Sequence, residues 1–305
     1  MVMWIRMKRR IIMAVDLESI FDDLERMTEP KSKDVIVRAP FNYPGGKSKS
    51  IKHILPHLPY RGGYVEPFGG SAAVLLARNT SRLEVFNDRY AGVVAFYRCI
   101  RDKNKMEALC TRLDLTIHSR EEFVWCKQTW ENVEDDVERA ARWYYTIQYS
   151  FAGLGRNFGR STSTKSVMSG KLRNRIPEFF SIHERIKRVQ IENQDWYDCL
   201  KDFDDPDTVF YLDPPYLDAS AGIYKHEMTR SDHQSLLDTI FSLDGFVAVS
   251  GYSNPLYEEQ DWDDRFEWDS FVSIQSIGGG EGNKKSQMTH LEKRETAKEI
   301  LWIKE

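Results

Sequence analysis

Residues 64–88, YVEPFGGSAAVLLARNTSRLEVFND, decide the fold. A short strand-forming run opens the stretch, two glycines follow, and an apolar segment of helical spacing leads to a second strand-forming run at residues 83–86. Parallel strands need a crossover connection, which is usually a helix, so this order predicts a βαβ unit. Strand-forming runs at residues 189–192, 209–212 and 245–251 extend it to a mainly parallel α/β sheet.

The turn at residues 66–71, Glu-Pro-Phe-Gly-Gly-Ser, lies between the first strand and the helix. Glycines let a ligand approach the backbone, and the helix N-terminus behind them adds favourable amide dipoles. Asp88 ends the next strand, where a carboxylate can hold the two hydroxyls of a ribose. The pattern G-x-G-x-x-G is missing, which disfavours a dinucleotide. The turn therefore predicts a cofactor that contains a ribose, with a purely structural turn as the alternative.

A second motif follows the strand-forming run at residues 208–212. It consists of Asp213, Pro214, Pro215 and Tyr216. Each proline fixes φ and removes a backbone donor, so the loop is stiff. An exocyclic amine on a planar base can donate to Asp213 and to the Pro214 carbonyl, while Tyr216 stacks on the base. Two acceptors would localise the amine's lone pair for attack on a methyl donor; an ordinary strand-terminating turn is the alternative.

A third motif is the glycine-rich turn at residues 41–47, which carries Tyr43 and Lys47. Its Gly-Gly-Lys-Ser run suggests a phosphate loop, but Phe41 stands where that motif requires its first glycine. The phosphate loop is therefore excluded. An aromatic ring and a lysine can instead clamp the two ends of a small cofactor, and a plain surface loop is the alternative.

The composition limits the class of protein. With 305 residues and 41% hydrophobic side chains, the chain can bury one large α/β domain and a smaller insertion. The four cysteines form no C-x-x-C pair and no metal-like spacing, which predicts reduced thiols, no metal site and a cytoplasmic location. No apolar run in the sequence approaches the roughly 20 residues of a membrane span, so no membrane partner is expected.

The motifs occur in the order Tyr43-Pro-Gly-Gly-Lys47, Val65-Glu-Pro-Phe-Gly-Gly-Ser71, Asn87-Asp88 and Asp213-Pro-Pro-Tyr216. In this order they resemble the D12 class of DNA adenine-N6 methyltransferases, over about residues 40–100 and 189–260. The resemblance implies a Rossmann-like catalytic domain with an antiparallel C-terminal strand. It also implies S-adenosyl-L-methionine as the methyl donor and an inserted, mostly helical domain that recognises double-stranded DNA.

The resemblance also implies the site, residue by residue. The implied cofactor contacts are Tyr43, Lys47, Glu66, Pro67, Phe68, Gly69, Gly70, Ser71, Asp88, Asp195 and Asp213. Among these, Asp88 is expected at the ribose and Asp195 near the cofactor adenine. The flipped target adenine is expected to be held by Asp213, Pro214, Pro215 and Tyr216.

The expected domains follow from the same resemblance. They are an N-terminal helix and linker (1–38), a catalytic domain (39–102 and 189–305) and an inserted helical, basic recognition domain (103–188). Near the C-terminus, strand-like runs at residues 266–277 and 300–304 predict an antiparallel pair. The glycine-rich and polar residues 278–298 between them predict a mobile loop.

The insertion contains a basic segment. Between Gly153 and Gln190 there are nine Lys and Arg residues and two Glu residues, so the local net charge is 9 − 2 = +7. The net charge of the whole chain is −4. This excess predicts a surface that contacts phosphates, with a solvated helix face as the alternative. The candidate DNA contacts are Arg156, Asn157, Arg160, Lys165, Lys171, Arg173 and Arg175. Family members that read GATC carry a Phe-Asn-Val-Pro stretch that this segment lacks, so the recognition sequence stays open.

The implied reaction is methyl transfer to the N6 amine of a flipped adenine in duplex DNA. Two alternatives stay open: an RNA base N-methyltransferase, because an Asp-Pro-Pro-Tyr loop accepts other amines, and a catalytically silent DNA-binding module on the same scaffold. Double-stranded DNA is the expected partner, and a cognate restriction endonuclease is a further candidate. A monomer or weak dimer is expected.

Overall fold

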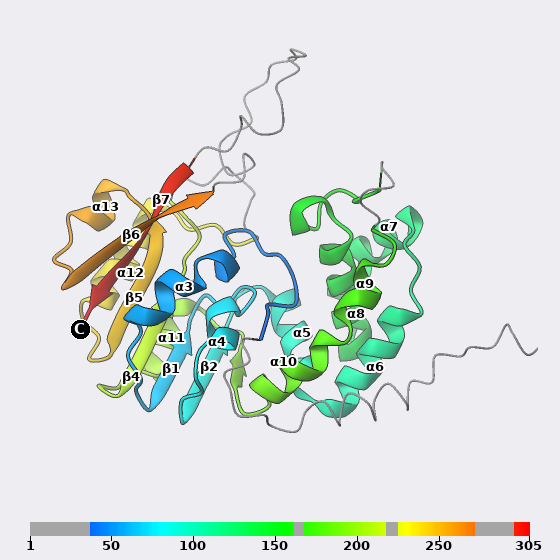
Figure 1. The fold of residues 1–305 in the computed structure, drawn as a ribbon, viewed down its shortest axis with the longest axis horizontal. Helices are drawn as coiled ribbons and strands as arrows, with labels where there is room; N and C mark the ends of the chain where they lie inside the picture. Colours follow the sequence, from blue (N-terminus) through cyan, green and yellow to red (C-terminus); the bar gives the residue numbers. More distant parts are fainter. Residues whose placement is uncertain (1–36, 162–167, 218–224, 272–295) are drawn as a thin grey trace, which may run out of the picture. The chain divides into compact units, whose positions relative to one another are not determined.

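A seven-stranded sheet in the order β3-β2-β1-β4-β5-β7-β6 organises the described chain (Figure 1). The strands are β1 (Gly63–Glu66), β2 (Leu83–Asn87), β3 (Gln190–Glu192), β4 (Thr208–Leu212), β5 (Phe246–Tyr252), β6 (Asp264–Phe271) and β7 (Thr296–Lys304). Strands β1 to β5 run parallel to one another, and β7 lies antiparallel to both β5 and β6. All five residues of β4 are buried, as is typical of a parallel strand covered on both faces. The predicted mainly parallel α/β sheet with an antiparallel C-terminal strand is confirmed.

The computed structural model describes residues 37–161, 168–217, 225–271 and 296–305. The predicted N-terminal helix, Lys165 and most of the predicted loop at residues 278–298 lie outside the described residues. The end of that loop was predicted wrongly. Residues 296–298 are the first residues of β7, where they pair with β6.

Helices connect and cover the strands. They are α3 (Ile51–Ile54), α4 (Ala73–Ala77), α5 (Ala91–Arg101), α6 (Lys103–Asp114), α7 (Arg120–Thr129), α8 (Asp136–Gln148), α9 (Lys171–Arg175), α10 (Glu178–Ile186), α11 (Trp196–Asp202), α12 (Arg230–Ile240) and α13 (Pro255–Glu258). Short 3-10 turns are η1 (Lys47–Lys49), η2 (Leu55–His57), η3 (Trp130–Asn132) and η4 (Phe151–Gly153). The elements from α5 to α10 occupy the crossover between β2 and β3.

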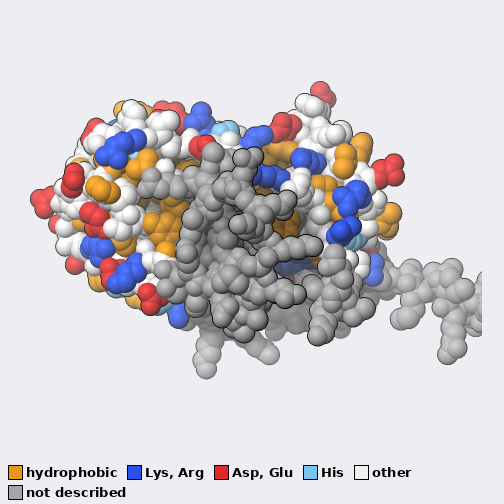
Figure 2. All heavy atoms as spheres, turned by 90° about the horizontal axis from the view of Figure 1, so that it is seen from above, with side chains coloured by type: hydrophobic (Ala, Val, Ile, Leu, Met, Phe, Trp, Pro, Cys, Tyr) orange, Lys and Arg blue, Asp and Glu red, His pale blue; other side chains and the backbone are white. Residues whose placement is uncertain are grey.

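The described surface mixes charges of both signs. On the face shown in Figure 2, Lys and Arg side chains lie among Asp and Glu side chains over both the strand-rich and the helical parts. This mixture follows from a composition of 43 basic and 47 acidic residues. A basic DNA-contacting surface must therefore be sought in particular side chains rather than in a uniformly basic face.

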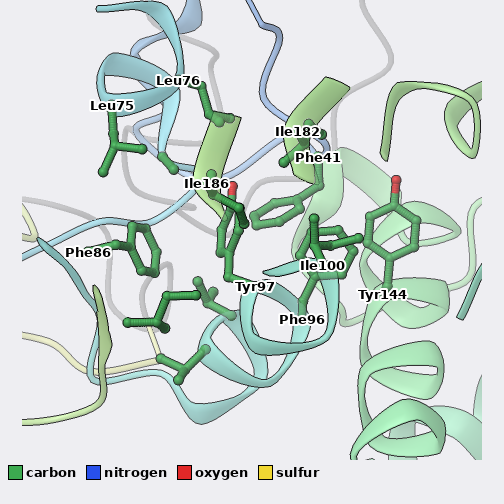
Figure 3. Packing of buried hydrophobic residues seen from close by; sticks show 14 of the residues in the cluster. Phe41, Leu75, Leu76, Phe86, Phe96, Tyr97, Ile100, Tyr144, Ile182 and Ile186 are labelled. Carbon is green, nitrogen blue, oxygen red and sulfur yellow. The ribbon is translucent and has the colours of Figure 1, made fainter. Parts of the chain in front are cut away.

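The crossover helices share one core with the sheet (Figure 3). The Phe96 ring from α5 stacks on Tyr144 from α8 with centroids 4.8 Å apart, and Phe179 from α10 meets Phe96 edge-on at 5.4 Å. Phe86 on β2 lies 4.7 Å from Tyr97 and belongs to the same cluster. The described residues from 37 onward accordingly belong to one compact unit. The role of residues 103–188 in recognition stays a prediction.

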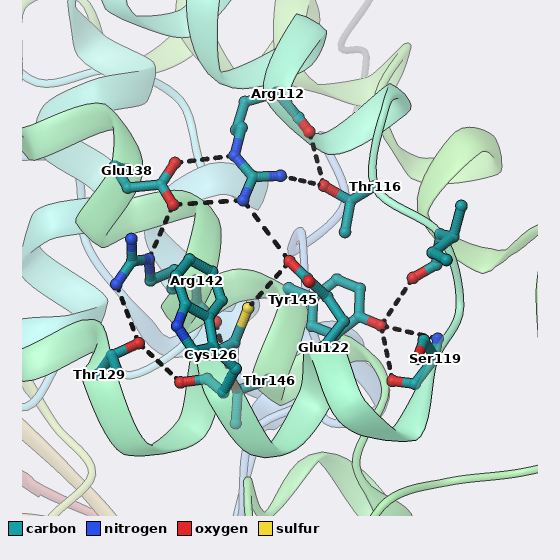
Figure 4. Close-up of polar contacts among 12 residues, drawn as sticks. Arg112, Thr116, Ser119, Glu122, Cys126, Thr129, Glu138, Arg142, Tyr145 and Thr146 are labelled. Carbon is teal, nitrogen blue, oxygen red and sulfur yellow. Dashed lines mark hydrogen bonds and ion pairs between the residues drawn. The ribbon is translucent and has the colours of Figure 1, made fainter.

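A polar cluster joins α6, α7 and α8 (Figure 4). The carboxylate of Glu138 accepts hydrogen bonds from Arg112 at 2.8 Å and from Arg142 at 2.7 Å. The Arg142 guanidinium also lies 3.7 Å from the centre of the Trp125 ring. Charged hydrogen bonds of this kind, partly shielded from water, fix the register of the three helices.

Gly92 gives a test of this packing. A Cβ added to Gly92 would lie 2.2 Å from Cδ1 and Nε1 of Trp143. Replacing glycine by alanine inside a helix normally raises the free energy of unfolding by about 1 kcal/mol. The clash with Trp143 should make this substitution destabilising instead. We expect Gly92→Ala to lower the free energy of unfolding by about 1–3 kcal/mol in urea titrations. Gly170→Ala, whose Cβ would meet nothing within 4 Å, is the control, and a stabilised Gly92→Ala protein would contradict the packing.

Candidate active site

A cavity of about 390 Å³ opens at the carboxyl ends of β1, β2 and β4. The sheet order reverses at β1, which is the point where open α/β sheets bind ligands. The residues that line the cavity include Tyr43, Lys47, Glu66, Pro67, Phe68, Gly69, Gly70, Ser71, Asp88, Asp195, Asp213 and Pro215. The fold thus brings every residue predicted for the cofactor to one cavity, whereas Pro214 and Tyr216 lie outside this lining.

The glycine turn is shaped by close backbone contacts. Gly70 has φ +49°, and a Cβ at Gly69 would lie 2.1 Å from the Phe86 ring. The Gly70 amide donates to Asp88 Oδ2 at 2.7 Å, and the Tyr90 amide donates to Asp88 Oδ1 at 2.7 Å. Burial raises the pKa of Asp88 to about 6, although both amides oppose this shift. Asp88 therefore ties the glycine turn to the end of β2.

Glu66 lies buried at the end of β1. The Tyr64 hydroxyl donates to its Oε1 at 2.7 Å. Burial raises the pKa of Glu66 to about 8, because the hydrogen bond from Tyr64 and more distant arginines compensate only part of the lost hydration. A carboxyl group in this state is a suitable partner for a ligand cation.

Lys47 joins the turn at residues 41–47 to the loop after β4. Its Nζ donates to Asp213 Oδ1 at 2.5 Å, to the Tyr216 hydroxyl at 2.7 Å and to the Gly45 carbonyl at 2.7 Å. Burial alone would lower the pKa of Lys47, but the carboxylates of Asp213 and Glu299 outweigh it and raise that pKa above its usual range. Lys47 is therefore cationic, and it opposes the rise that burial causes in the pKa of Asp213.

Helix α8 holds this turn in place. The Tyr144 hydroxyl and the Gln148 amide both donate to the Pro40 carbonyl, at 2.9 and 3.0 Å. The Phe41 ring is buried and packs edge-on against Trp143 of α8 with centroids 5.1 Å apart. The crossover helices therefore position Lys47 as well as the surface around it.

Other residues of the site were missed by the sequence analysis. Ser250 on β5 donates to Asp213 Oδ1 at 3.1 Å. Glu299 on β7 lies 3.4 Å from Lys47 Nζ and is buried. Ser250 lies within the strand predicted at residues 245–251, whereas Glu299 lies just before the strand predicted at residues 300–304. Neither residue belongs to a motif that indicates a contact with Lys47 or Asp213.

Asp195 lies at the rim of the cavity. Its side chain caps α11 by accepting the Tyr197 amide at 3.1 Å, and it forms an exposed ion pair with Arg89 at 3.3 Å. Next to it, the Trp196 ring lies 6.4 Å from the Phe68 ring at an interplanar angle of 28°. The predicted residues Asp195 and Phe68 thus come together with two missed lining residues, Trp196 and Tyr197.

The predicted DNA contacts divide into two groups. Arg156, Asn157 and Arg160 are exposed. Lys171 donates to the Gln148 carbonyl and Arg175 pairs with Glu178. Arg173 is also exposed, and it forms a surface ion pair with Asp114. Arg185 contributes to the basic excess but is bound to the buried Glu84 at 2.6 Å. The count of basic residues therefore overstates the charge available to a partner.

Comparisons with known proteins identify the family. Residues 43–266 match the family described as D12 class N6 adenine-specific DNA methyltransferase. The chain belongs to this family. The family predicted from the motif order is thus confirmed, and the chain is a D12-class enzyme. Glu299 lies beyond the matched residues.

Relatives of this D12 enzyme have similar names. The chain is 28% identical to the Type II methyltransferase M1.LlaDCHI of Lactococcus lactis subsp. cremoris over 247 residues, which cover 74% of this chain and 86% of that protein. It is 25% identical to the DNA adenine methylase of Escherichia coli (strain K12) over 190 residues, covering 60% and 66%. The DNA N-6-adenine-methyltransferase of Escherichia phage P1 is 24% identical over 200 residues, covering 63% and 25%.

Within residues 37–161, 168–217, 225–271 and 296–305, no three His, Cys, Asp or Glu side chains lie together as a metal ion would require. No helix in these ranges has the length and apolar character needed to cross a bilayer. The four cysteines are buried as thiols.

Glu66 predicts a pH dependence of stability. Its folded-state pKa of about 8 lies above the ordinary 4.5, so the folded state retains a proton that the unfolded state has lost between these values. Stability should therefore fall as the pH rises through this window, by up to about 1.4 kcal/mol per pH unit. Glu66→Gln keeps the neutral shape and should remove this decline, measured as the difference in urea stability between the two proteins at pH 5 to 9. Parallel curves for the two proteins would contradict the buried neutral carboxyl.

Proposed function

We propose that this D12 enzyme transfers a methyl group from S-adenosyl-L-methionine to the N6 amine of an adenine in duplex DNA. The observation that carries the proposal is the position of Asp213. It lies on the wall of the cavity that all the predicted cofactor residues line, and Lys47 opposes its protonation. An amine acceptor and a cofactor-sized cavity thus meet at one point, which is what direct methyl transfer requires.

The cavity suits this cofactor chemically. The buried Glu66 offers a carboxylate to the ammonium group of the methionine part, whose charge would restore the ionised form. Asp88 already accepts two amides, but each carboxylate oxygen has a second acceptor position, so it can also accept the ribose hydroxyls. Phe68 and Trp196 provide flat apolar surfaces for the adenine.

The residues of the loop after β4 would act on the target amine. Among the described residues, the donors to Asp213 reach its Oδ1, so Oδ2 is the oxygen that we assign to the N6 amine. The Pro214 carbonyl would be the second acceptor. Both interactions draw on the N6 hydrogens and localise the nitrogen lone pair, and the cofactor, when bound, supplies an electrophilic methyl group. Asp213 and Lys47 would contribute through positioning and electrostatics.

DNA would reach the site beside the crossover helices. A second cavity of about 440 Å³ shares Tyr43, Pro44 and Tyr90 with the first and is also lined by Arg156. Bringing an adenine out of the duplex costs a few kcal/mol, which phosphate contacts by exposed arginines can offset. The recognition domain at residues 103–188, a cognate restriction endonuclease and a monomeric or weakly dimeric state are further parts of this proposal.

The proposal is tested by incubating the purified protein with labelled S-adenosyl-L-methionine and unmethylated genomic DNA. Single-molecule sequencing then locates N6-methyladenine. We expect methylation within one short sequence motif, which the experiment would also identify. Label that enters RNA instead would favour an RNA base N-methyltransferase. DNA binding without any transfer of label would favour a catalytically silent DNA-binding module.

Asp213→Asn tests the role of the carboxylate. The substitution keeps the shape of the side chain but removes its charge and one acceptor, so we expect kcat to fall by about 100-fold or more. DNA binding, measured by a fluorescence titration, should stay near that of the unchanged protein. Asp244→Asn, an exposed residue in the turn before β5, is the matched control. An Asp213→Asn enzyme with unchanged kcat would refute the role.

Arg156 and Arg160 test the DNA surface. Each phosphate contact contributes about 0.9 to the slope of log K against log salt concentration. The double variant Arg156→Ala/Arg160→Ala should therefore weaken DNA binding and reduce that slope by about 2. Arg265→Ala/Lys298→Ala on β6 and β7, where both residues pair with Glu267, removes the same charge elsewhere. Equal slopes in the two double variants would place the DNA surface away from Arg156 and Arg160.

A further inference from the structure

Glu299 forms a buried hydrogen-bonded group behind the reacting side chains. Its Oε2 accepts from Ser50 Oγ at 2.7 Å and from Trp268 Nε1 at 3.2 Å. Its Oε1 lies 3.4 Å from Lys47 Nζ and accepts from the Tyr216 hydroxyl at 3.4 Å. One oxygen is thus fixed by the scaffold, and the other faces the lysine and tyrosine of the site.

We propose that Glu299 is a positioning residue for methyl transfer, which holds Lys47 and the Tyr216 hydroxyl so that Asp213 presents Oδ2 to the target amine. The inference rests on the proposed function. It assigns a role to a residue of the C-terminal strand, outside the residues 43–266 that match the family.

The count of donors and charges supports this role. An ammonium group has three N–H donors, and Lys47 uses them on Gly45, Asp213 and Tyr216. Asp213 and Glu299 place two carboxylates around this single cation. Without the second carboxylate, Lys47 would be attracted to Asp213 alone and could bridge both of its oxygens, which would compete with the amine.

The position of β7 explains why Glu299 can act here. Glu299 pairs with Tyr252 of β5 in the antiparallel register, and the Tyr252 ring lies 4.7 Å from the Tyr216 ring. The inserted antiparallel strand therefore brings a carboxylate to the end of β5, beside the loop that carries Asp213. A C-terminal strand that only completed the sheet would need no charged residue buried at this position.

If Glu299 had a purely structural role, its replacement would change the profile of kcat against pH differently. The titratable groups that face Asp213 are Lys47, Glu299 and the phenols of Tyr211, Tyr216 and Tyr252. The negative charge of Glu299 raises the pKa of Asp213. Glu299→Gln removes this charge, so the pKa of Asp213 should fall, and the acid limb of the profile of kcat against pH should move to lower pH. Loss of packing alone would leave that limb in place.

The experiment compares the full-length Glu299→Gln enzyme with the unchanged enzyme in methyl transfer to DNA at pH 4.5 to 9. We expect kcat at neutral pH to fall about 10- to 100-fold, as for a misplacement of about 1 Å, with the acid limb shifted to lower pH and KM for the cofactor little changed. Glu267 on β6 is an exposed glutamate paired with Lys298. Glu267→Gln is the matched control and should leave kcat, the acid limb and KM unchanged.

Two smaller changes keep the test decisive if Glu299→Gln folds poorly. Ser50→Ala removes a donor to Oε2, and Glu299→Asp keeps the charge but shortens its reach. Both should lower kcat less than Glu299→Gln, and Glu299→Asp should leave the acid limb near its original position. An unchanged kcat, or a loss of kcat with the acid limb unmoved in Glu299→Gln, would overturn the inference. Absence of methyl transfer by the unchanged enzyme would instead contradict the proposed function.

Discussion

The ion pair between Lys47 and Asp213 is the interaction on which the site depends. A carboxylate on a cavity wall tends to take up a proton, because burial penalises its charge. A protonated Asp213 would lose acceptor capacity for an amine. The ammonium group of Lys47, 2.5 Å away, opposes this protonation, while its remaining donors hold Tyr216 and the Gly45 carbonyl. One lysine thus joins two loops and sets the charge of the acceptor.

The fold supplies this pair from distant parts of the chain. The turn that carries Lys47 is held by Pro40 and Phe41 against α8. Asp213 follows β4, the strand next to β1 at the point where the sheet order reverses. The helices in the crossover therefore do two things: they bury a core shared with the sheet, and they position the turn whose Lys47 contacts the loop after β4.

The sequence predicted the parts of the site that lie in short motifs. The glycine turn, Asp88 and Asp213 could be predicted because strand, turn and acid occur within a few residues of one another. Glu299 and Ser250 could not, since their roles arise only from the pairing of β7 with β5. In the basic segment, Lys171 and Arg185 bind partners on other elements, and no local pattern in the sequence indicates these contacts.

The most direct measurement is a crystal structure of the enzyme with duplex DNA and an unreactive analogue of S-adenosyl-L-methionine. We expect an adenine outside the duplex stack, with its N6 within hydrogen-bond distance of Asp213 Oδ2 and the Pro214 carbonyl, and Lys47 still bound to Oδ1. An adenine whose N6 contacts neither acceptor, with Lys47 turned away from Asp213, would contradict this expectation.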